Sequence, residues 1–559
     1  MRTYRPIVAF LSGAFLCLFM THPAFTQGRG QGNGGQPEFI APPDLVLLNG
    51  NIATVDDQNT FVQALAIRDG EIIATGFNGQ IRGLAMSETQ VIDLGGRTVL
   101  PGLIDGTLHG VRNGYHCYTQ HVRLDRIYSR AEALEAYAIK AAELGAGVWI
   151  FTRSGWNVNQ LDVPGIFTRA ELDSVMPENP AFVIGSGAPT QANTRALQAL
   201  GLDDPAHADG VLTNAERNMI NPLLGFTERS IDEQAACLAD FIADANAAGL
   251  TSWDDPGGND VFNPAGGLAV AFVDNHGFQA VNQLWRDGEL NARIVLHMTS
   301  FGGLTTVLED TRHAVSLLGD DFLRMGGPGE EIIAGSGAIQ IGTPAFDELV
   351  EINTYLAENR WNFQHHASAN LSQETIITGW EMANAVASIA DLHWSMLHPE
   401  DISENTLARL AALNANVVPT PEGAVSGGSH VYRRMYDSPA NMCLGTDALY
   451  AGPWPPFVNI WYATSGDSFV PGVPGVEAAQ LLTREDALRA ATINCGKVMG
   501  QEGRLGSLQP GWHADLIVLA DDYFTVPDEE LRQLSSVLTI VGGAIVYSDG
   551  TLVAPVNNF

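Results

Sequence analysis

The sequence predicts an α/β fold in which a parallel sheet wound with helices closes as an eight-stranded barrel, and three observations support it. Through the middle of the chain, short apolar runs alternate with Ala- and Leu-rich stretches of helical character. Eight of these runs qualify as strands, which is the number that closes a (β/α)8 TIM barrel. Both ends of the chain are rich in β-type sequence instead, so we expect a separate β part built from the two termini.

The first 26 residues predict a cleaved signal peptide. Arg2 and Arg5 precede an apolar run from Ile7 to Met20, and a small-x-small cleavage site ends at Thr26. The run is about 14 residues long, short of the roughly 20 that span a bilayer. We therefore expect no membrane anchor after cleavage and a periplasmic or secreted protein. Residues 27–43, which begin with a Gly/Gln-rich tract, are expected to form a flexible leader.

Hairpin signals mark the β part. An Asn-Gly turn at 49–50 and an Asp-Gly turn at 69–70 each separate two β-type runs. The far end of the chain contributes the runs Ala514–Leu519 and Val537–Tyr547. The predicted β domain comprises residues 44–98 and 505–559.

The predicted barrel occupies residues 99–504. Its candidate strands, in chain order, are Val99–His109, Leu250–Asp255, Ala292–Met298, Phe322–Glu331, Trp361–Ala367, His393–Pro399, Asn416–Thr420 and Asn441–Ala448. The gap between the first two is too long for a single helix. We therefore predict a large insertion after the first barrel strand, a subdomain over residues 110–249.

The charge balance excludes some partners. The chain has 559 residues with 29 Lys+Arg against 63 Asp+Glu, a formal net charge of −34. A sequence-independent nucleic-acid binder needs a basic face to neutralise phosphates, and an anionic membrane surface needs one too. We therefore expect a small-molecule substrate and no nucleic acid. The oligomeric state, a homo-oligomer included, is left open.

The cysteines are compatible with either redox state. Cleavage at Thr26 leaves four of them, Cys117, Cys237, Cys443 and Cys495. An even count in an exported chain permits disulfides, but the wide spacing predicts no framework. Buried free thiols are at least as compatible with this pattern.

Several predicted strands end in acid/base or metal-ligand residue types. These residues are His109 on the first strand, Glu330 on the fourth, His365 and His366 on the fifth, His398 on the sixth and Asp447 on the eighth. The fourth-, fifth- and sixth-strand residues follow one another at about one βα unit, and the eighth follows at about two. Polar residues at these strand ends face the active site of a barrel, and imidazoles with carboxylates are zinc ligands. The sequence therefore predicts one divalent metal site.

Each of these residues has a simpler alternative role. A single His near a strand end is more often a hydrogen-bonded core or surface residue than a ligand. Glu331 competes with Glu330 as a ligand, and either carboxylate could be an exposed loop residue. His116, Cys117 and His121 form a second cluster in the loop after the first strand, where substrate-pocket or packing roles are favoured over ligation.

Two other motifs lack the neighbouring residues that their function would need. The run Gly-Gly-Pro-Gly at 326–329 resembles a phosphate-binding loop only loosely, because no Lys-Ser/Thr follows it and Pro328 removes a backbone donor. There is no Gly-x-Ser-x-Gly elbow with triad partners in order, so a serine nucleophile has little support.

The strand-end motifs resemble those of the amidohydrolase superfamily, in its YtcJ-like branch (amidohydrolase family 3). The matching stretches are 99–106, 362–366, 392–398, 444–447, 482–494 and 503–519. The similarity covers nearly everything from Asp44 onward, and the tail is its most specific part. It implies a distorted (β/α)8 barrel with a β-sandwich assembled from both termini.

One departure from the family pattern affects the metal count. The first strand of the family ends in His-x-His, whereas here the pair is Thr107 and His109. A Thr hydroxyl is a weak ligand, so the deeper of the family's two metal positions lacks a donor. Some deacetylases of the superfamily that break this pair hold one ion through a fourth-strand carboxylate and two histidines. The corresponding set here would be Glu330, His366 and His398.

The predicted function is therefore a metal-dependent hydrolase of an amide, another C–N bond or an ester, with one divalent ion and zinc favoured. Asp447 is the predicted general acid/base, and His109 would bind a substrate oxygen or a weak second metal. Thr107, His116 and His365 are the predicted substrate contacts. The alternatives are a metal-poor pseudoenzyme or binding protein, and a metal-assisted isomerase or lyase on the same barrel.

Overall fold

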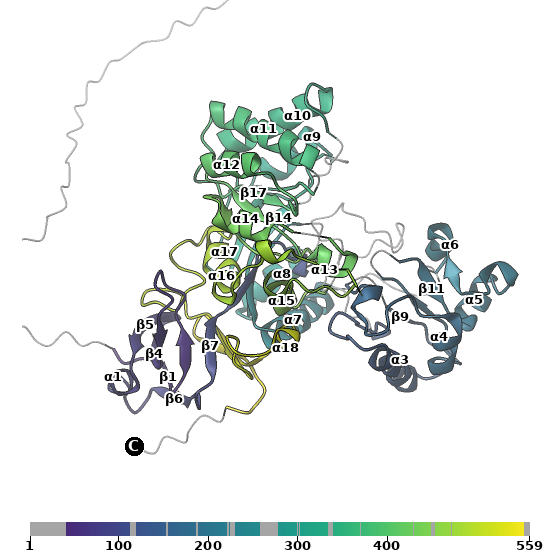
Figure 1. Cartoon of the computed structure of the whole chain (residues 1–559), viewed down its shortest axis with the longest axis horizontal. Helices are drawn as coiled ribbons and strands as arrows, with labels where there is room; N and C mark the ends of the chain where they lie inside the picture. Colours follow the sequence, from purple (N-terminus) through teal and green to yellow (C-terminus); the bar gives the residue numbers. More distant parts are fainter. Residues whose placement is uncertain are drawn as a thin grey trace, which may run out of the picture. The chain divides into compact units, whose positions relative to one another are not determined.

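The computed structural model describes most of the chain from Ala41 onward (Figure 1). The described residues are 41–111, 119–152, 155–185, 188–220, 223, 230–257, 278–298, 300, 302–333, 339–368, 370–428, 430–448, 453–470, 472–473 and 475–552. The predicted signal peptide and most of the predicted leader lie outside these residues, as do His116 and Cys117. Among the described helices, none has the length and apolar character of a membrane span.

Two parallel four-stranded sheets occupy the centre, in the orders β15-β14-β13-β8 and β16-β17-β18-β19. The strands are β8 (Leu103–Asp105), β13 (Leu250–Asp255), β14 (Arg293–Met298), β15 (Leu323–Pro328), β16 (Gln364–His366), β17 (Ser395–Leu397), β18 (Asn416–Val418) and β19 (Asn441–Met442). Each lies within or overlaps one of the eight candidate strands, so their predicted positions are confirmed. Nearly all their side chains are buried, as is typical of parallel sheets covered on both faces.

Backbone hydrogen bonds connect the two sheets at both of their edges. Just beyond β15, the Glu330 carbonyl accepts from the His366 N–H at the end of β16, at 2.9 Å. At the other edge, the Thr107 carbonyl beyond β8 accepts from the Asp447 N–H beyond β19, at 2.7 Å. The residues that follow the strands therefore meet on the carboxyl side of the two sheets.

Helices alternate with these strands along the chain. They are α7 (Ile231–Ala247), α8 (Phe278–Asp287), α9 (Leu304–Thr311), α10 (Pro344–Glu358), α11 (Asn370–Val386), α12 (Glu404–Ala412), α13 (Glu422–Ser426), α14 (Tyr432–Asp437), α15 (Pro456–Ser465), α16 (Arg484–Ala490) and α17 (Ile493–Val498). Side-chain caps set several starts: a Ser230–Glu233 capping box opens α7, and Thr343 caps α10. The buried helix faces share one large hydrophobic core with the strands.

Both termini build a second, β-rich part with the sheet orders β5-β4-β1-β6 and β22-β21-β20-β7-β2-β3 (Figure 1). The strands are β1 (Leu45–Leu48), β2 (Asn51–Ala53), β3 (Phe61–Val62), β4 (Ala64–Arg68), β5 (Glu71–Gly76), β6 (Gln90–Asp93), β7 (Thr98–Pro101), β20 (Leu516–Leu519), β21 (Ser536–Val541) and β22 (Ala544–Ser548). Leu47, Leu65 and Leu516 belong to one core that both sheets share. The expected joining of the two chain ends is therefore present.

The first predicted strand, Val99–His109, is two strands in the structure. β7 pairs with β2 and β20 in the terminal sheet, whereas β8 pairs with β13 in the parallel sheet. Gly102 lies between them, and a Cβ at this position would lie 2.1 Å from the Thr251 hydroxyl oxygen. Glycine thus permits the close approach at which the chain passes from one sheet to the other.

The predicted insertion contains its own sheet, in the order β12-β11-β10-β9. Its elements are α3 (Arg130–Leu144), β9 (Ile150–Thr152), α4 (Arg169–Val175), β10 (Ala181–Val183), β11 (Thr190–Ala192), α5 (Thr194–Leu200), β12 (Val211–Leu212) and α6 (Asn214–Asn218). Two hydrophobic cores, one of them around Trp156, belong to it alone. Leu238 and Phe241 of α7 pack instead in the large core of the parallel sheets. The separately packed part therefore ends before α7.

A disulfide joins Cys443, just after β19, to Cys495 in α17. Cys237 of α7 is disulfide-bonded as well. The sequence pattern had left thiols and disulfides open because residues far apart in the chain show no pairing signal. Disulfides of this kind persist in oxidising compartments.

A buried ion pair connects the parallel sheets to the terminal sheet. Two guanidinium nitrogens of Arg293, Nε and Nη2, donate to the Asp515 carboxylate, at 2.6 and 2.9 Å, and both side chains are about 3% exposed or less. Replacing Asp515 with Asn leaves the buried guanidinium without a counter-charge, so we expect a loss of about 3–5 kcal/mol in the free energy of unfolding. Equilibrium unfolding in denaturant measures this loss for the variant against the wild type.

The matched control for Asp515→Asn is the exposed pair of Arg195 and Glu178, whose atoms lie 2.6 Å apart. Glu178→Gln removes the same kind of charge from the surface and is expected to cost no more than about 1 kcal/mol. Equal losses for the two variants would contradict the argument from burial.

Candidate metal centre

Glu330 lies at the centre of a cluster of imidazoles. Its Oε2 is 3.1 Å from His366 Nδ1 and 3.0 Å from His398 Nε2. Its Oε1 is 3.2 Å from His109 Nε2, and the same nitrogen is 3.2 Å from Asp447 Oδ1. The structure thus brings together five of the residues that the sequence singled out at strand ends.

The strands position these side chains in a simple way. His366 is the last residue of β16, and His398 directly follows β17. Glu330 follows β15, whose Gly326 and Gly327 leave room for neighbouring strands: a Cβ on Gly327 would lie 1.8 Å from the Asn362 carbonyl oxygen. The glycine run therefore serves close strand packing, which agrees with its rejection as a phosphate loop.

Two members of the cluster adopt an unusual backbone conformation. His398 has φ of 60° and Asp447 has φ of 49°, both in the left-handed region that non-glycine residues seldom occupy. Each such residue costs on the order of 1–3 kcal/mol, and such strain is concentrated at functional sites. The turn at each strand end aims the side chain at the cluster.

The charges in the cluster are strongly coupled. Burial alone would raise the pKa of Glu330, but hydrogen bonds from His109, His366 and His398 hold it well below its usual range. Burial would lower the pKa of His398, yet the carboxylates of Asp447 and Glu330 raise it to about 10. The imidazole N–H groups therefore neutralise Glu330 in this structure. A bound cation would take over that role and replace these protons.

The tautomer of His109 is set by a backbone group. Its Nδ1 lies 2.7 Å from the Gly257 carbonyl oxygen, which can only accept a hydrogen bond. Nδ1 therefore carries a proton, and Nε2 is the nitrogen that faces Glu330 and Asp447. This arrangement is typical of a histidine that binds a metal or a polarised substrate through Nε2.

Two overlapping groups of donors could hold a metal ion within the described residues. One consists of Glu330, His366 and His398, and the other of His109, Glu330 and Asp447, each with donor atoms within 4.8 Å of one another. Two imidazoles with one carboxylate are the ligands of many catalytic zinc sites. The His366 side chain is 31% exposed while His398 is 1% exposed, so the cluster opens to solvent on the His366 side.

Other predicted residues lie outside the cluster. Glu331 belongs to neither donor group, so of the two adjacent carboxylates Glu330 is the one in position. His365 is fully buried, with Nδ1 on the His366 carbonyl and its ring edge-on to Phe363, and burial lowers its pKa to about 4. The prediction that His365 contacts substrate gains no support from this placement.

Thr107 and the histidines of the loop after the first strand lie outside the two donor groups or outside the described residues. The Thr107 hydroxyl is buried without a hydrogen-bond partner among the described residues and belongs to neither donor group. His121 stacks on Phe151 in the insertion, at 5.4 Å between ring centroids. His116, the predicted substrate contact in that loop, lies outside the described residues.

The sequence reasoning missed Thr420 and Glu400. The His398 Nδ1 lies 3.2 Å from the Thr420 hydroxyl oxygen, and that hydroxyl donates to Glu400 Oε1 at 2.8 Å. Thr420 ended a predicted strand, the seventh, so its position at the carboxyl side was a usable signal. A hydroxyl is not among the usual metal ligands, so residue type alone does not select Thr420.

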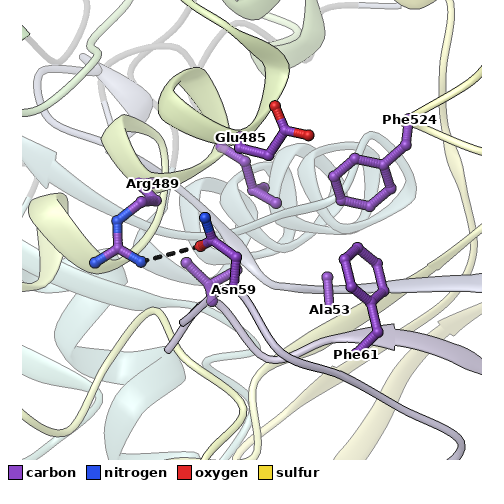
Figure 2. A pocket seen from close by; sticks show the side chains of 8 residues that line it. Ala53, Asn59, Phe61, Glu485, Arg489 and Phe524 are labelled. Carbon is purple, nitrogen blue, oxygen red and sulfur yellow. Dashed lines mark hydrogen bonds between the residues drawn. The ribbon is translucent and has the colours of Figure 1, made fainter. Parts of the chain in front are cut away.

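A small cavity lies elsewhere, between the terminal β part and α16 (Figure 2). Ala53, Phe61 and Phe524 line its apolar side, and Arg489 donates to Asn59 beside it. Its volume is about 10 Å³, the space of a single water molecule. None of its lining residues belongs to the Glu330 cluster, so we assign it to packing.

Parallel strands with imidazoles and carboxylates at their carboxyl ends define a class of α/β enzymes that work with a divalent metal. The comparison with known families agrees with this class. The chain belongs to the amidohydrolase family, whose model matches residues 90–547. The resemblance stated from the strand-end motifs and the tail is therefore confirmed.

Individual relatives are distant but cover nearly the whole chain. N-substituted formamide deformylase from Arthrobacter pascens is 23% identical and covers 90% of this chain and 98% of its own. Putative amidohydrolase YtcJ from Bacillus subtilis (strain 168) is 22% identical, with 89% and 98% covered. The crystal structure of atrazine chlorohydrolase TrzN from Arthrobacter aurescens TC1, complexed with zinc, shares the fold at a TM-score of 0.51 and 14% identity, with 90% and 95% covered.

Proposed function

We propose that the protein is a metal-dependent hydrolase of a small molecule, acting on an amide or another C–N bond. The observation that carries the proposal is the Glu330 carboxylate held by three imidazoles at the ends of parallel strands. The names of a deformylase and an amidohydrolase among the relatives support the C–N bond as the target. N-substituted formamides are therefore the first substrates to test.

The proposed ligands of one divalent ion are Glu330, His366 and His398. Zinc is favoured because two imidazoles and a carboxylate suit it, and because the structurally similar chlorohydrolase was crystallised with zinc. A divalent ion supplies a Lewis acid that acidifies water and polarises a carbonyl oxygen. The missing first-strand donor at Thr107 is the reason to propose one ion rather than two.

The proposed proton carrier is Asp447. Its carboxylate is about 9% exposed and lies 3.2 Å from His109 Nε2, the nitrogen that also faces Glu330. As general base it would take a proton from the attacking water, and as general acid it would give that proton to the leaving nitrogen. His109, with Nε2 turned into the site, would donate from Nε2 to the substrate oxygen when its ring carries both protons.

The proposal also covers the domain organisation of the chain and the compartment in which the protein works. We propose that the two parallel sheets form a distorted (β/α)8 barrel, with a β-sandwich from both termini and an insertion between β8 and α7. We also propose export after cleavage at Thr26, to the periplasm or the medium. The Cys443–Cys495 disulfide supports an oxidising compartment.

Elemental analysis of the purified protein tests the proposal. We expect about one zinc or similar ion per chain in the wild type and a value near zero in His366→Ala, because a site with two remaining protein donors holds zinc weakly. A wild-type content near zero would contradict the metal-dependent function. A content near two would show that the group of His109, Glu330 and Asp447 holds a second ion despite Thr107.

A further inference from the structure

Both ring nitrogens of His398 are engaged by different groups. Nε2 faces Glu330 at 3.0 Å, and Nδ1 faces the Thr420 hydroxyl oxygen at 3.2 Å. His398 and Thr420 are both buried, so water does not compete for these contacts. The Thr420 hydroxyl also lies 2.8 Å from Glu400 Oε1. The three side chains therefore form a line from Glu400 through Thr420 to the imidazole.

The directions of the two hydrogen bonds follow from taking Glu400 as the carboxylate. A hydroxyl has one proton, and an ionised carboxylate can only accept. With Glu400 as the carboxylate, Thr420 gives its proton to Glu400, and the Thr420 oxygen then accepts from His398. Nδ1 must then carry a proton, and in the neutral imidazole the lone pair is on Nε2, the nitrogen turned toward Glu330.

The backbone of Thr420 is fixed by a second contact. His430 Nε2 donates to the Thr420 carbonyl oxygen at 2.8 Å, and the Tyr462 hydroxyl lies 3.0 Å from His430 Nδ1. All of these contacts are buried or partly buried. Thr420 is therefore held at its backbone carbonyl as well as at its hydroxyl.

We infer that Thr420, oriented by Glu400, is a positioning residue that sets the His398 tautomer so that Nε2 is available to the metal. The inference rests on the proposed function, since it assigns a role toward the proposed ion. Neither residue belongs to a donor group, so neither is a proposed ligand. Groups that orient a ligating histidine in this way typically change metal affinity by about 10–100-fold when removed.

The test compares Thr420→Val, which removes the hydroxyl at constant shape, with Thr420→Ser, which keeps it. Competition with a chromophoric chelator measures Zn²⁺ affinity. We expect Thr420→Val to bind Zn²⁺ about 10–100-fold more weakly and Thr420→Ser to retain the wild-type affinity. The visible absorption of the Co²⁺-loaded protein should change in the valine variant and return in the serine variant, because it reports the ligand geometry.

The matched control is Thr251→Val. Thr251 is an equally buried threonine near the start of β13, and its hydroxyl donates to the Leu103 carbonyl at 3.3 Å. This variant loses a buried hydroxyl at the opposite end of the strands and should bind Zn²⁺ like the wild type. It separates a general packing defect from a loss of tautomer control.

Each outcome has a defined meaning. Equal affinity in Thr420→Val and Thr251→Val would overturn the inference while leaving the proposed function intact. Equal weakening in Thr420→Val and Thr420→Ser would also overturn it, because the hydroxyl would then not be the cause. A wild type that binds no Zn²⁺ would overturn the proposed function and the inference together.

Discussion

Replacing Asp447 with Asn is expected to lower kcat by about 10²–10⁴-fold, the usual contribution of a general acid/base. Asn keeps the size of the side chain and tolerates the left-handed backbone at this position, where φ is 49°. It cannot accept the proton of the attacking water. The proposed ligands do not include Asp447, so the metal content should stay at the wild-type value. Steady-state kinetics and elemental analysis on the same preparation measure both quantities.

The substrate for this measurement is the N-substituted formamide that the wild type hydrolyses fastest. Asp57→Asn serves as the control because the Asp57 side chain is fully exposed and belongs to neither donor group. It should leave kcat unchanged. Undiminished kcat in Asp447→Asn would remove Asp447 from the mechanism, and loss of the ion from that variant would make it a ligand instead.

Replacing Glu330 with Gln is expected to remove both the ion and the activity. Glu330 is the one residue common to both donor groups, and its carboxylate contacts three imidazoles. The amide carries no charge, so it binds a divalent ion poorly. A metal ion lowers the activation barrier by several kcal/mol. We therefore expect its loss to reduce kcat/KM by at least about 10³-fold.

The control for Glu330→Gln is Glu331→Gln, the same change one residue along the chain. Glu331 belongs to neither donor group, so its variant should keep the wild-type metal content and most of its activity. The opposite result, metal lost from Glu331→Gln and kept by Glu330→Gln, would exchange the roles of the two carboxylates.

The sequence predicted the strands well because their signal is local. Runs such as Leu250–Asp255 and Asn416–Val418 are apolar and short, and each is confirmed as a parallel strand. The first predicted strand was wrong in extent, since β7 and β8 belong to different sheets. Nothing in a continuous apolar run shows that the chain changes partners at Gly102; the close approach to Thr251 does.

The candidate site could be predicted only by residue type. His365 and His366 are adjacent and chemically equal, yet successive strand residues point to opposite faces, so one contacts Glu330 while the other packs beside Phe363. Glu330 and Glu331 are likewise adjacent and chemically equal, so the sequence could not show which of them lies in the cluster. The contact of Thr420 with His398 joins two different strand ends, and no local pattern encodes it.

By itself, the sequence determined where eight parallel strands lie and which of them end in imidazole or carboxylate. Both facts follow from residue hydrophobicity and order along the chain, which are local. The tertiary structure alone decided that Glu330 is the carboxylate at the centre, and that Nε2 of His398 is the nitrogen turned toward it. The physical reason is that distances between strand ends depend on how the sheets are joined. They are therefore set by packing across strands rather than by any stretch of sequence.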